Sequence, residues 1–238
     1  STLFSPERQF LPAVVTLENY LRLFQKTTFL NNLGHSLIVS SGTMLLGLSV
    51  SITAAYAFSR FRFVGRRVLM LQFLLVNMFP IVLLIIPLFI IMKGLGLLDT
   101  HLGLILAHST FSIPFATWMM ISYFDAIPRS LDEAAMVDGC TPVGAMFRVV
   151  LPLTVPGIIA TGIYIFITSW NEYLYASILA GQNVRTLTVA IQTLLGEYEI
   201  AWGLLTAGGV VGALPVTLLF MLIQKRLVAG MTQGAVKG

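Results

Sequence analysis

The sequence predicts an all-α protein, a polytopic membrane helix bundle with five visible spans. Of its 238 residues, 57% are hydrophobic and only 10% are charged, whereas an ordinary soluble domain has about 25% charged residues. The mean hydropathy is +0.89. So few charged side chains cannot cover the surface of a soluble protein of this size, and a disordered chain would be poor in apolar residues. We therefore expect an integral membrane protein and not a soluble enzyme.

The long charge-free stretches define the spans, because a helix that crosses a bilayer needs about 20 mostly apolar residues. The prolines inside these stretches are expected to act as ordinary kinks, which membranes tolerate. We expect the fourth span to begin after Pro156 and to continue past Glu172. The expected spans are 33–58, 68–92, 100–124, 157–180 and 200–224.

Four arginines in the short connection 60–67 orient the bundle, since cytoplasmic loops carry an excess of basic residues. We place this connection in the cytoplasm. Because successive spans alternate in direction, the N-terminal segment 1–32, which contains no span, is expected outside. The transmembrane core then covers 33–238, with a cytoplasmic loop at 125–155 and a cytoplasmic C-terminal tail at 227–238.

The loop 125–155 is too long to be a simple turn, and its residues predict two short helices. Ser130 and Glu133 have the spacing of a capping box, which predicts a helix over 131–138. Gly139 stands where helices commonly end in a left-handed residue. We therefore expect the first helix to stop at this glycine.

A second helix is expected directly afterwards. Thr141 suits its cap and Pro142 its first turn, and the helix should stop before Pro152. The helix pair carries more apolar residues than a solvated loop needs, which favours docking into a groove of a partner. The apolar residues that we expect to be exposed are Ala134, Ala135, Met136, Met146 and Phe147.

The same segment resembles the EAA loop of ABC importer permeases. The resemblance rests on Glu-Ala-Ala at 133–135, the spaced Gly139 and Val-Val-Leu-Pro at 149–152. Ser-Trp-Asn-Glu-Tyr at 169–173 and the ending 230–238 look like carbohydrate importers, and more narrowly like the second permease of maltose- and trehalose-type systems. The resemblance implies a type I importer fold. Members of this family usually have six spans, so we expect the first to be missing from this sequence.

The resemblance also implies how the loop works. In that family it forms a coupling helix that sits in a cleft of a separate ATP-hydrolysing subunit. The C-terminal tail of such permeases reaches between the two ATPase subunits. The residues that this resemblance assigns to ATPase coupling are Glu133, Ala134, Ala135, Asp138, Gly139, Met146, Phe147, Leu151 and Pro152.

Polar residues inside the spans are candidates for the transport path. A carboxylate such as Glu172 costs about 2.5–3.5 kcal/mol at the centre of a membrane helix, so it should face protein or a wet cavity. One interpretation is a polar contact between helices that fixes their packing. The other is a polar patch on the path, to which Asn171 and Asn77 would contribute, with Trp170 and Tyr173 stacking on sugar rings. Aromatic residues near a membrane boundary also serve as anchors.

Metal binding and enzyme chemistry find no support. His35, His101 and His108 have no carboxylate or cysteine at ligand spacing, so we expect no metal site. The single cysteine, Cys140, allows no internal disulfide. An intramembrane hydrolase would show a pattern such as His-Glu-x-x-His or Gly-x-Ser-x-Gly, and neither occurs. The chain also has no phosphate-binding Gly-x-x-x-x-Gly-Lys-[Ser/Thr] loop. We therefore expect no cofactor in this chain, with ATP and Mg on a partner ATPase.

We expect the transmembrane subunit of an ATP-driven sugar importer, located in a bacterial or archaeal cytoplasmic membrane and working by alternating access. Its expected partners are a dimer of ATP-binding subunits, a second homologous permease, an extracytoplasmic sugar-binding protein, membrane lipid and the sugar itself. Nucleic acid is not among them. The outer segment 181–202, with Arg185, Glu197, Tyr198 and Glu199, would face the binding protein.

Two alternatives keep the membrane location but change the function. The same architecture could carry an amino acid, a polyamine or phosphate, since the EAA loop alone does not select a cargo. A passive channel is a further possibility, although a docking loop for an ATPase would then have no purpose.

Overall fold

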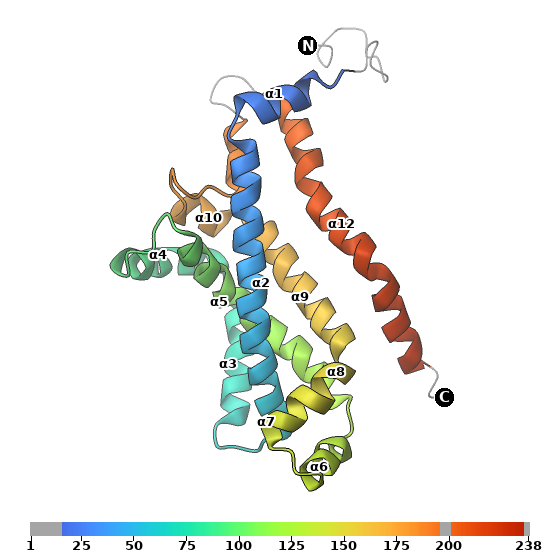
Figure 1. Cartoon of the computed structure of the whole chain (residues 1–238). Helices are drawn as coiled ribbons and strands as arrows, with labels where there is room; N and C mark the ends of the chain where they lie inside the picture. Colours follow the sequence, from blue (N-terminus) through green and yellow to red (C-terminus); the bar gives the residue numbers. More distant parts are fainter. Residues whose placement is uncertain (1–15, 196–200, 236–238) are drawn as a thin grey trace.

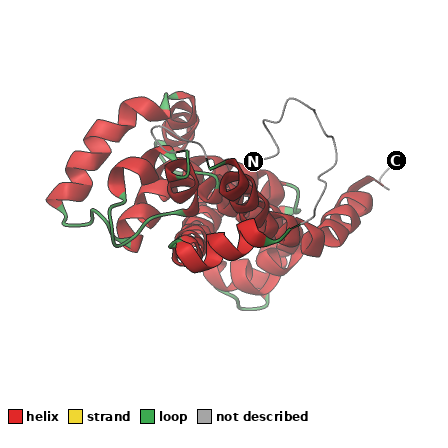
Figure 2. Ribbon diagram, turned by 90° about the horizontal axis from the view of Figure 1, so that it is seen from above, coloured by secondary structure: helices red, strands yellow, loops and turns green. Residues whose placement is uncertain are grey.

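The computed structural model describes residues 16–195 and 201–235, with side chains described as far as residue 221. Within these residues the regular structure is helical throughout. The long helices run along one direction, and short helices cover both ends of the bundle (Figure 1). Seen along the bundle, α4 reaches out on one side and the C-terminal end of α12 on the opposite side (Figure 2).

Three of the described helices are each long and apolar enough to cross a membrane, and two further candidate spans are bent pairs of helices. Together they make up to five spans. The elements are α1 (Glu18–Lys26), α2 (Phe29–Arg60), α3 (Arg66–Met78), η2 (Ile81–Leu84), α4 (Ile85–Gly94), α5 (His101–Asp125), α6 (Arg129–Val137), α7 (Pro142–Ala145), η3 (Met146–Val150, a π turn), α8 (Leu151–Leu153), α9 (Val155–Trp170), α10 (Leu174–Leu179), α11 (Leu187–Thr193) and α12 (Trp202–Ala235).

The predicted first and third spans are confirmed: α2 extends a few residues beyond 33–58, and α5 is displaced by one residue from 100–124. The last span is also present, because α12 is helical from Trp202; residue 200, where we expected it to start, lies outside the described residues. The tail expected at 227–238 is not a separate element as far as Ala235, because α12 continues through it. Residues 236–238 lie outside the description.

The second span differs from the prediction of one kinked helix over 68–92. It breaks between α3 and η2, and its two halves bend by 102°. Pro80 explains the break: the residue before a proline is pushed out of the helical region, and Phe79 has an extended backbone with φ −77° and ψ 133°. The chain therefore turns sideways into α4 (Figure 1).

The fourth span also differs from the prediction. Its helix α9 ends at Trp170 instead of continuing to residue 180, and a separate short helix, α10, begins at Leu174. The helix starts at Val155, with Pro156 in its first turn, where a missing N–H is tolerated. At this same end, a bend of 83° separates α9 from the helical segment Pro142–Leu153 that precedes it.

Helix α2 forms the centre of the bundle and packs against α5 and α9. Its buried side is a stripe of small and polar residues at every third or fourth position, which lets neighbouring helices approach closely. Gly47 illustrates this approach: a Cβ there would lie 3.0 Å from the side chain of Ile165. The buried stripe consists of Asn32, Ser36, Ser40, Thr43, Gly47, Ser51, Ala55 and Ser59.

The short helix α1 crosses one end of the bundle, beside the first turns of α12 (Figure 1). Its Leu23 is fully buried and belongs to a cluster with Phe29, Phe166 and Ala207. The part of segment 1–32 that the structure describes is therefore packed onto the spans.

Candidate functional site

The helix pair α6–α7 lies at the end of the bundle opposite α1 (Figure 1). The predicted end of α6 is confirmed: Gly139 has φ +89°. Its N–H donates to the carbonyl of Met136 at 3.0 Å, and the N–H of Cys140 donates to that of Ala135 at 2.9 Å. These two bonds form a Schellman motif, which satisfies carbonyls that the helix end leaves free.

The predicted start of the next helix is also confirmed. Thr141 caps α7, since its hydroxyl accepts the N–H of Gly144 at 3.1 Å, and Pro142 occupies the first turn. The helix does not stop before Pro152, however. It passes through the π turn η3 into α8. Pro152 stands in the first turn of α8, where the N–H group that proline lacks is not required for a helical hydrogen bond.

The expected capping box at the start of α6 is wrong. The helix begins at Arg129, directly after Pro128, and no side chain caps it. Ser130 is therefore inside the first turn, and the Glu133 side chain is exposed. The extended backbone of Pro128 (ψ 133°) starts the helix two residues earlier than a cap at Ser130 would.

The exposure of the helix pair also corrects the sequence analysis. We expected Ala135 and Met146 to be exposed, but they are buried, at 7% and 4% exposure. Met146 packs in a cluster with residues of α2 and α5 because it faces the bundle. Val137 and Val143, which the sequence analysis did not select, are 87% and 61% exposed.

The residues assigned to coupling therefore divide between two faces, and only the outward face is available to a partner. The inward group is Ala135, Met146 and Leu151. The exposed group, which we call the docking face together with Val137 and Val143, is Glu133, Ala134, Asp138, Gly139, Phe147 and Pro152.

A buried ion pair joins the helix pair to the central helix. Arg60 Nε lies 2.8 Å from Asp132 Oδ2, and both side chains are less than 10% exposed. The hydroxyl of Tyr56 donates to Asp132 Oδ1 at 3.0 Å and also lies 3.1 Å from the carbonyl oxygen of Pro142. Asp132 could not be selected from the sequence, because its partners come from a helix far away in the chain.

Further hydrogen bonds strengthen this junction. The guanidinium of Arg129 donates to the carbonyl of Ser59 at 2.6 Å, and that of Arg60 donates to the carbonyl of Ile127 at 3.1 Å. The Ser59 hydroxyl donates to Asp125. The end of α2 and the start of α6 are thus held together from both sides.

A second polar cluster lies where α9 breaks. The carboxylate of Glu172 accepts the N–H groups of Tyr175 at 2.8 Å and Ala176 at 3.0 Å, and so caps α10. Its Oε2 also lies 3.1 Å from Nε2 of His108. The glutamate side chain is only 9% exposed. The contacts correspond to the first interpretation, a polar contact between helices, and they explain why the predicted long helix stops.

The histidine continues this cluster across the bundle. His108 Nδ1 lies 2.8 Å from the hydroxyl of Ser169, which in turn lies 3.4 Å from that of Thr43. The spacing of residues in the sequence could not reveal this pairing, because Glu172 is distant from His108 in the chain. No group of three or more potential metal ligands occurs among the described residues.

The two broken spans meet beside this cluster. Tyr175, which is buried, places its hydroxyl 3.4 Å from the carbonyl of Ile81. Each break is preceded by an exposed asparagine: Asn77 and Asn171 both donate to the carbonyl four residues earlier. Tyr173 is 41% exposed at the second break.

Trp170 has a different environment from these exposed residues. It is 4% exposed, and its indole N–H donates to the carbonyl of Gly212 at 3.1 Å. Its ring stacks on Phe166. It offers no open ring face to a sugar and joins α9 to α12.

Asp99, which was not selected from the sequence, joins its own loop to the loop at 181–184. Its carboxylate accepts the N–H groups of Gly181, Asn183 and Val184 at 2.8 to 3.0 Å. Burial raises the pKa of this carboxyl, but the backbone N–H groups outweigh that effect and hold its pKa below the ordinary value. Of the outer segment that we expected to face a binding protein, Glu197, Tyr198 and Glu199 lie outside the described residues.

Comparisons with known proteins agree with this architecture. Residues 47–233 match the family "Binding-protein-dependent transport system inner membrane component". The chain belongs to this family. It is 40% identical over 230 residues to the sulfoquinovosyl glycerol transport system permease protein of Agrobacterium fabrum, covering 96% of this chain and 81% of the relative. It is 38% identical over 233 residues to the trehalose transport system permease protein of Mycobacterium tuberculosis, covering 97% and 85%.

Solved structures with the same fold include a bacterial ABC transporter involved in the import of the acidic polysaccharide alginate. The TM-score is 0.79 at 25% identity, and the match covers 92% of this chain and 82% of that one. A second structure, of a bacterial alginate ABC transporter in complex with an alginate pentasaccharide-bound periplasmic protein, matches at a TM-score of 0.72 and 18% identity, covering 90% and 84%. The inner membrane component is therefore an ABC importer permease by fold, a transporter subunit rather than an enzyme.

Proposed function

We propose that this inner membrane component forms one half of the path of an ATP-driven sugar importer. Its relatives are permeases whose names specify trehalose and sulfoquinovosyl glycerol transport. A sugar is therefore the cargo that the relatives favour over an amino acid, a polyamine or phosphate. The second half of the path would come from a homologous permease, since one chain of about five spans cannot readily enclose a sugar.

The observation that carries the coupling proposal is the junction between α2 and α6. The docking face exposes Val137 and Phe147, which suits insertion into a groove of an ATPase subunit. The buried pair of Arg60 and Asp132 fixes this face to the central helix. A displacement of α6 by a dimer of ATP-binding subunits, which hold ATP and Mg, would therefore reach the membrane through α2.

For the path itself we propose the exposed groups at the two helix breaks. Interrupted helices near the membrane centre are typical of transporter binding sites. Asn77, Asn171 and Tyr173 would contact the sugar. Glu172 would not contact the sugar; it would hold α10 in place by capping it and by its contact with His108. Trp170 would serve only to pack α9 against α12.

The orientation and the remaining partners belong to the same proposal. The arginine-rich connection 60–67 and the docking face lie at the same end of the bundle, so both would face the cytoplasm (Figure 1). The start of the chain would then lie outside. The outer loops would meet an extracytoplasmic sugar-binding protein, as in the solved complex with a periplasmic protein.

The coupling proposal is tested with two valine variants in the assembled importer. Val137→Glu puts a charge on the docking face, and Val64→Glu puts the same charge on a fully exposed valine of connection 60–67. We expect the first variant to lose about tenfold or more in ATPase affinity, as at an interface hot spot, and the second to lose little. Equal ATPase recovery and equal sugar-stimulated ATP hydrolysis in both variants would contradict the proposal.

The cargo is tested separately, by uptake into vesicles that contain the complete importer. Trehalose and other glycosides are compared with an amino acid, a polyamine and inorganic phosphate. ATP-dependent uptake confined to the sugars supports the proposal. Uptake of a non-sugar solute with no sugar uptake would replace it with the same architecture serving another cargo.

A further inference from the structure

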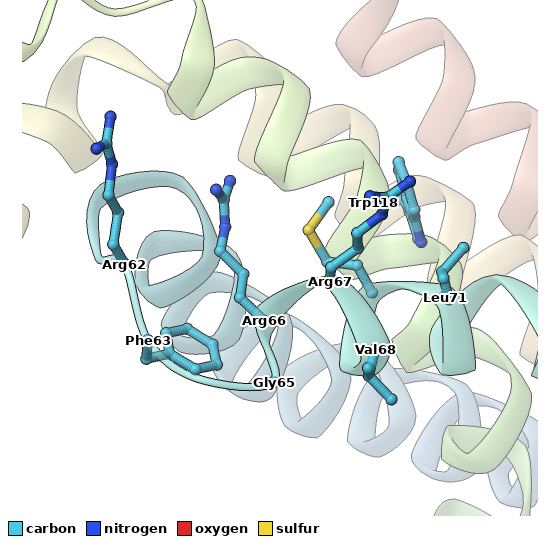
Figure 3. A pocket seen from close by; sticks show the side chains of 9 residues that line it. Arg62, Phe63, Gly65, Arg66, Arg67, Val68, Leu71 and Trp118 are labelled. Atoms are coloured by element: carbon cyan, nitrogen blue, oxygen red, sulfur yellow. The ribbon is translucent and has the colours of Figure 1, made fainter.

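A hollow of about 650 Å³ lies where the connection after α2 meets α3 and α5. Its polar lining is cationic, with the guanidinium groups of Arg62, Arg66 and Arg67, and no carboxylate lines it. The side chains of Arg62 and Arg66 extend to the same side, and Arg67 lies close to Trp118 (Figure 3). Three positive charges are thus gathered around one cavity.

The donors of this hollow lack acceptors within the part of the chain that the structure describes. None of the three guanidinium groups takes part in an ion pair there. The Nε atom of Arg66 and the indole N–H of Trp118 are both buried without a hydrogen-bond partner. Because buried donors are almost always paired in proteins, an acceptor-rich anion would complement this site.

The remaining wall of the hollow is apolar. It is formed by Val68, Met70, Leu71 and the ring of Trp118. Val68 and Leu71 are 58% and 50% exposed. These residues follow the arginines along α3, which runs from Arg66 into the bundle, so the charges gather at one end of an apolar surface.

We propose that this hollow binds an anionic phospholipid of the membrane leaflet on the arginine side. The phosphodiester accepts hydrogen bonds from the guanidinium groups and the indole N–H, and an acyl chain lies along Met70 and Leu71. A phosphodiester has acceptors and no donors, which is the complement of this lining. Basic pockets between helices at the cytoplasmic surface recognise such head groups.

The apolar wall favours a lipid over a free anion. Inorganic phosphate would satisfy the same donors but would leave Val68 and Leu71 uncovered. A lipid covers both parts at once and joins α3 to Trp118 of α5. Bound lipid would therefore stabilise the packing of the broken second span on α5.

The test uses the complete importer, purified with its partner chains and delipidated in detergent. Native mass spectrometry counts the lipids retained on titration with dioleoylphosphatidylglycerol or with dioleoylphosphatidylcholine. The variants are Arg62→Gln, Arg66→Gln and Arg67→Gln, singly and combined, and Trp118→Phe, which removes the N–H but keeps a ring. Arg22→Gln is the matched control, because this exposed arginine lies on α1 and pairs only with Glu18.

We expect saturable binding of phosphatidylglycerol that each single arginine variant weakens about fivefold and that Arg22→Gln leaves unchanged. Trp118→Phe should weaken it as well, so the proposal stays testable if the triple variant fails to assemble. Equal binding of the two lipids, or unchanged binding in the arginine variants, would overturn the proposal. So would full competition by inorganic phosphate, which would assign the hollow to a free anion, or a crosslink from Leu71→Cys to a partner subunit, which would assign it to protein.

Discussion

Arg60 and Asp132 form a buried ion pair between the end of the central helix and the short helix that carries the docking face. Their Nε and Oδ2 atoms are 2.8 Å apart. Tyr56 adds a hydrogen bond to the same carboxylate. Because both charges are withdrawn from water, the pair is sensitive to the loss of either member. The pair therefore ties the end of α2 to α6.

The first prediction concerns the stability of this junction. Asp132→Ala leaves the guanidinium of Arg60 buried and unpaired, which we expect to cost about 3–5 kcal/mol. Thermal unfolding of the assembled importer measures the loss. Glu133→Ala removes the neighbouring, exposed carboxylate and should change stability by no more than about 0.5 kcal/mol. The double variant Arg60→Met with Asp132→Leu should recover most of the loss; equal melting of Asp132→Ala and wild type would contradict the prediction.

The second prediction concerns the contact between His108 and Glu172. Because the two side chains touch at 3.1 Å, the effects of His108→Ala and Glu172→Ala on stability should not add. We expect a coupling energy of about 0.5–3 kcal/mol in a double-mutant cycle measured by thermal unfolding. His101→Ala, paired with Glu172→Ala, is the control, because His101 contacts His35 instead. Strict additivity in both cycles would show that the contact contributes nothing.

The third prediction is a pH dependence at Asp99. Its folded-state pKa lies below the ordinary value of 3.8, so its stabilising effect is fully present above that value and is lost as pH falls through the folded pKa. Asp99→Asn should lower the unfolding temperature at pH 7, and the difference from wild type should shrink as the pH falls below about 4. Asparagine tolerates the left-handed backbone of this residue (φ +56°). A difference that is constant with pH would contradict the assignment.

The fourth prediction concerns the end of α6. A side chain at Gly139 would meet no atom within 4 Å, so the cost of Gly139→Ala is conformational, about 1–2 kcal/mol in the left-handed region. Gly139→Asn should cost less. Gly94→Ala, also without close neighbours but at the last residue of α4 and without a positive φ, should be neutral or stabilising. Thermal unfolding and sugar-stimulated ATP hydrolysis are the measurements, and equal behaviour of the two alanine variants would sink the prediction.

The prolines in the spans show that a local sequence pattern does not always predict whether a helix continues or breaks. We expected all of the span prolines to kink their helices without breaking them. Pro114 and Pro215 do lie inside the continuous helices α5 and α12. Pro80, in contrast, stands at a break with a bend of 102°. The residue type is the same, so the presence of a proline does not by itself decide between a kink and a break.

The exposure of the helix pair shows the same limit. Gly139 and Thr141 were predicted correctly, because each acts on backbone groups within about one turn. Ala135 and Met146 were placed on the wrong face. Which side of a short helix turns inward depends on the helices beneath it, and a stretch of nine residues does not specify them.

By itself, the sequence determined the membrane location, the first, third and last spans, the helix pair and the family, because charge-free length, basic clusters and local capping patterns are properties of neighbouring residues. Only the tertiary structure decided the contacts between Arg60 and Asp132, between His108 and Glu172, and between Asp99 and the loop at 181–184. Each of these contacts joins groups from distant parts of the chain. Buried polar groups find partners through the packing of whole helices, and no local pattern encodes that arrangement.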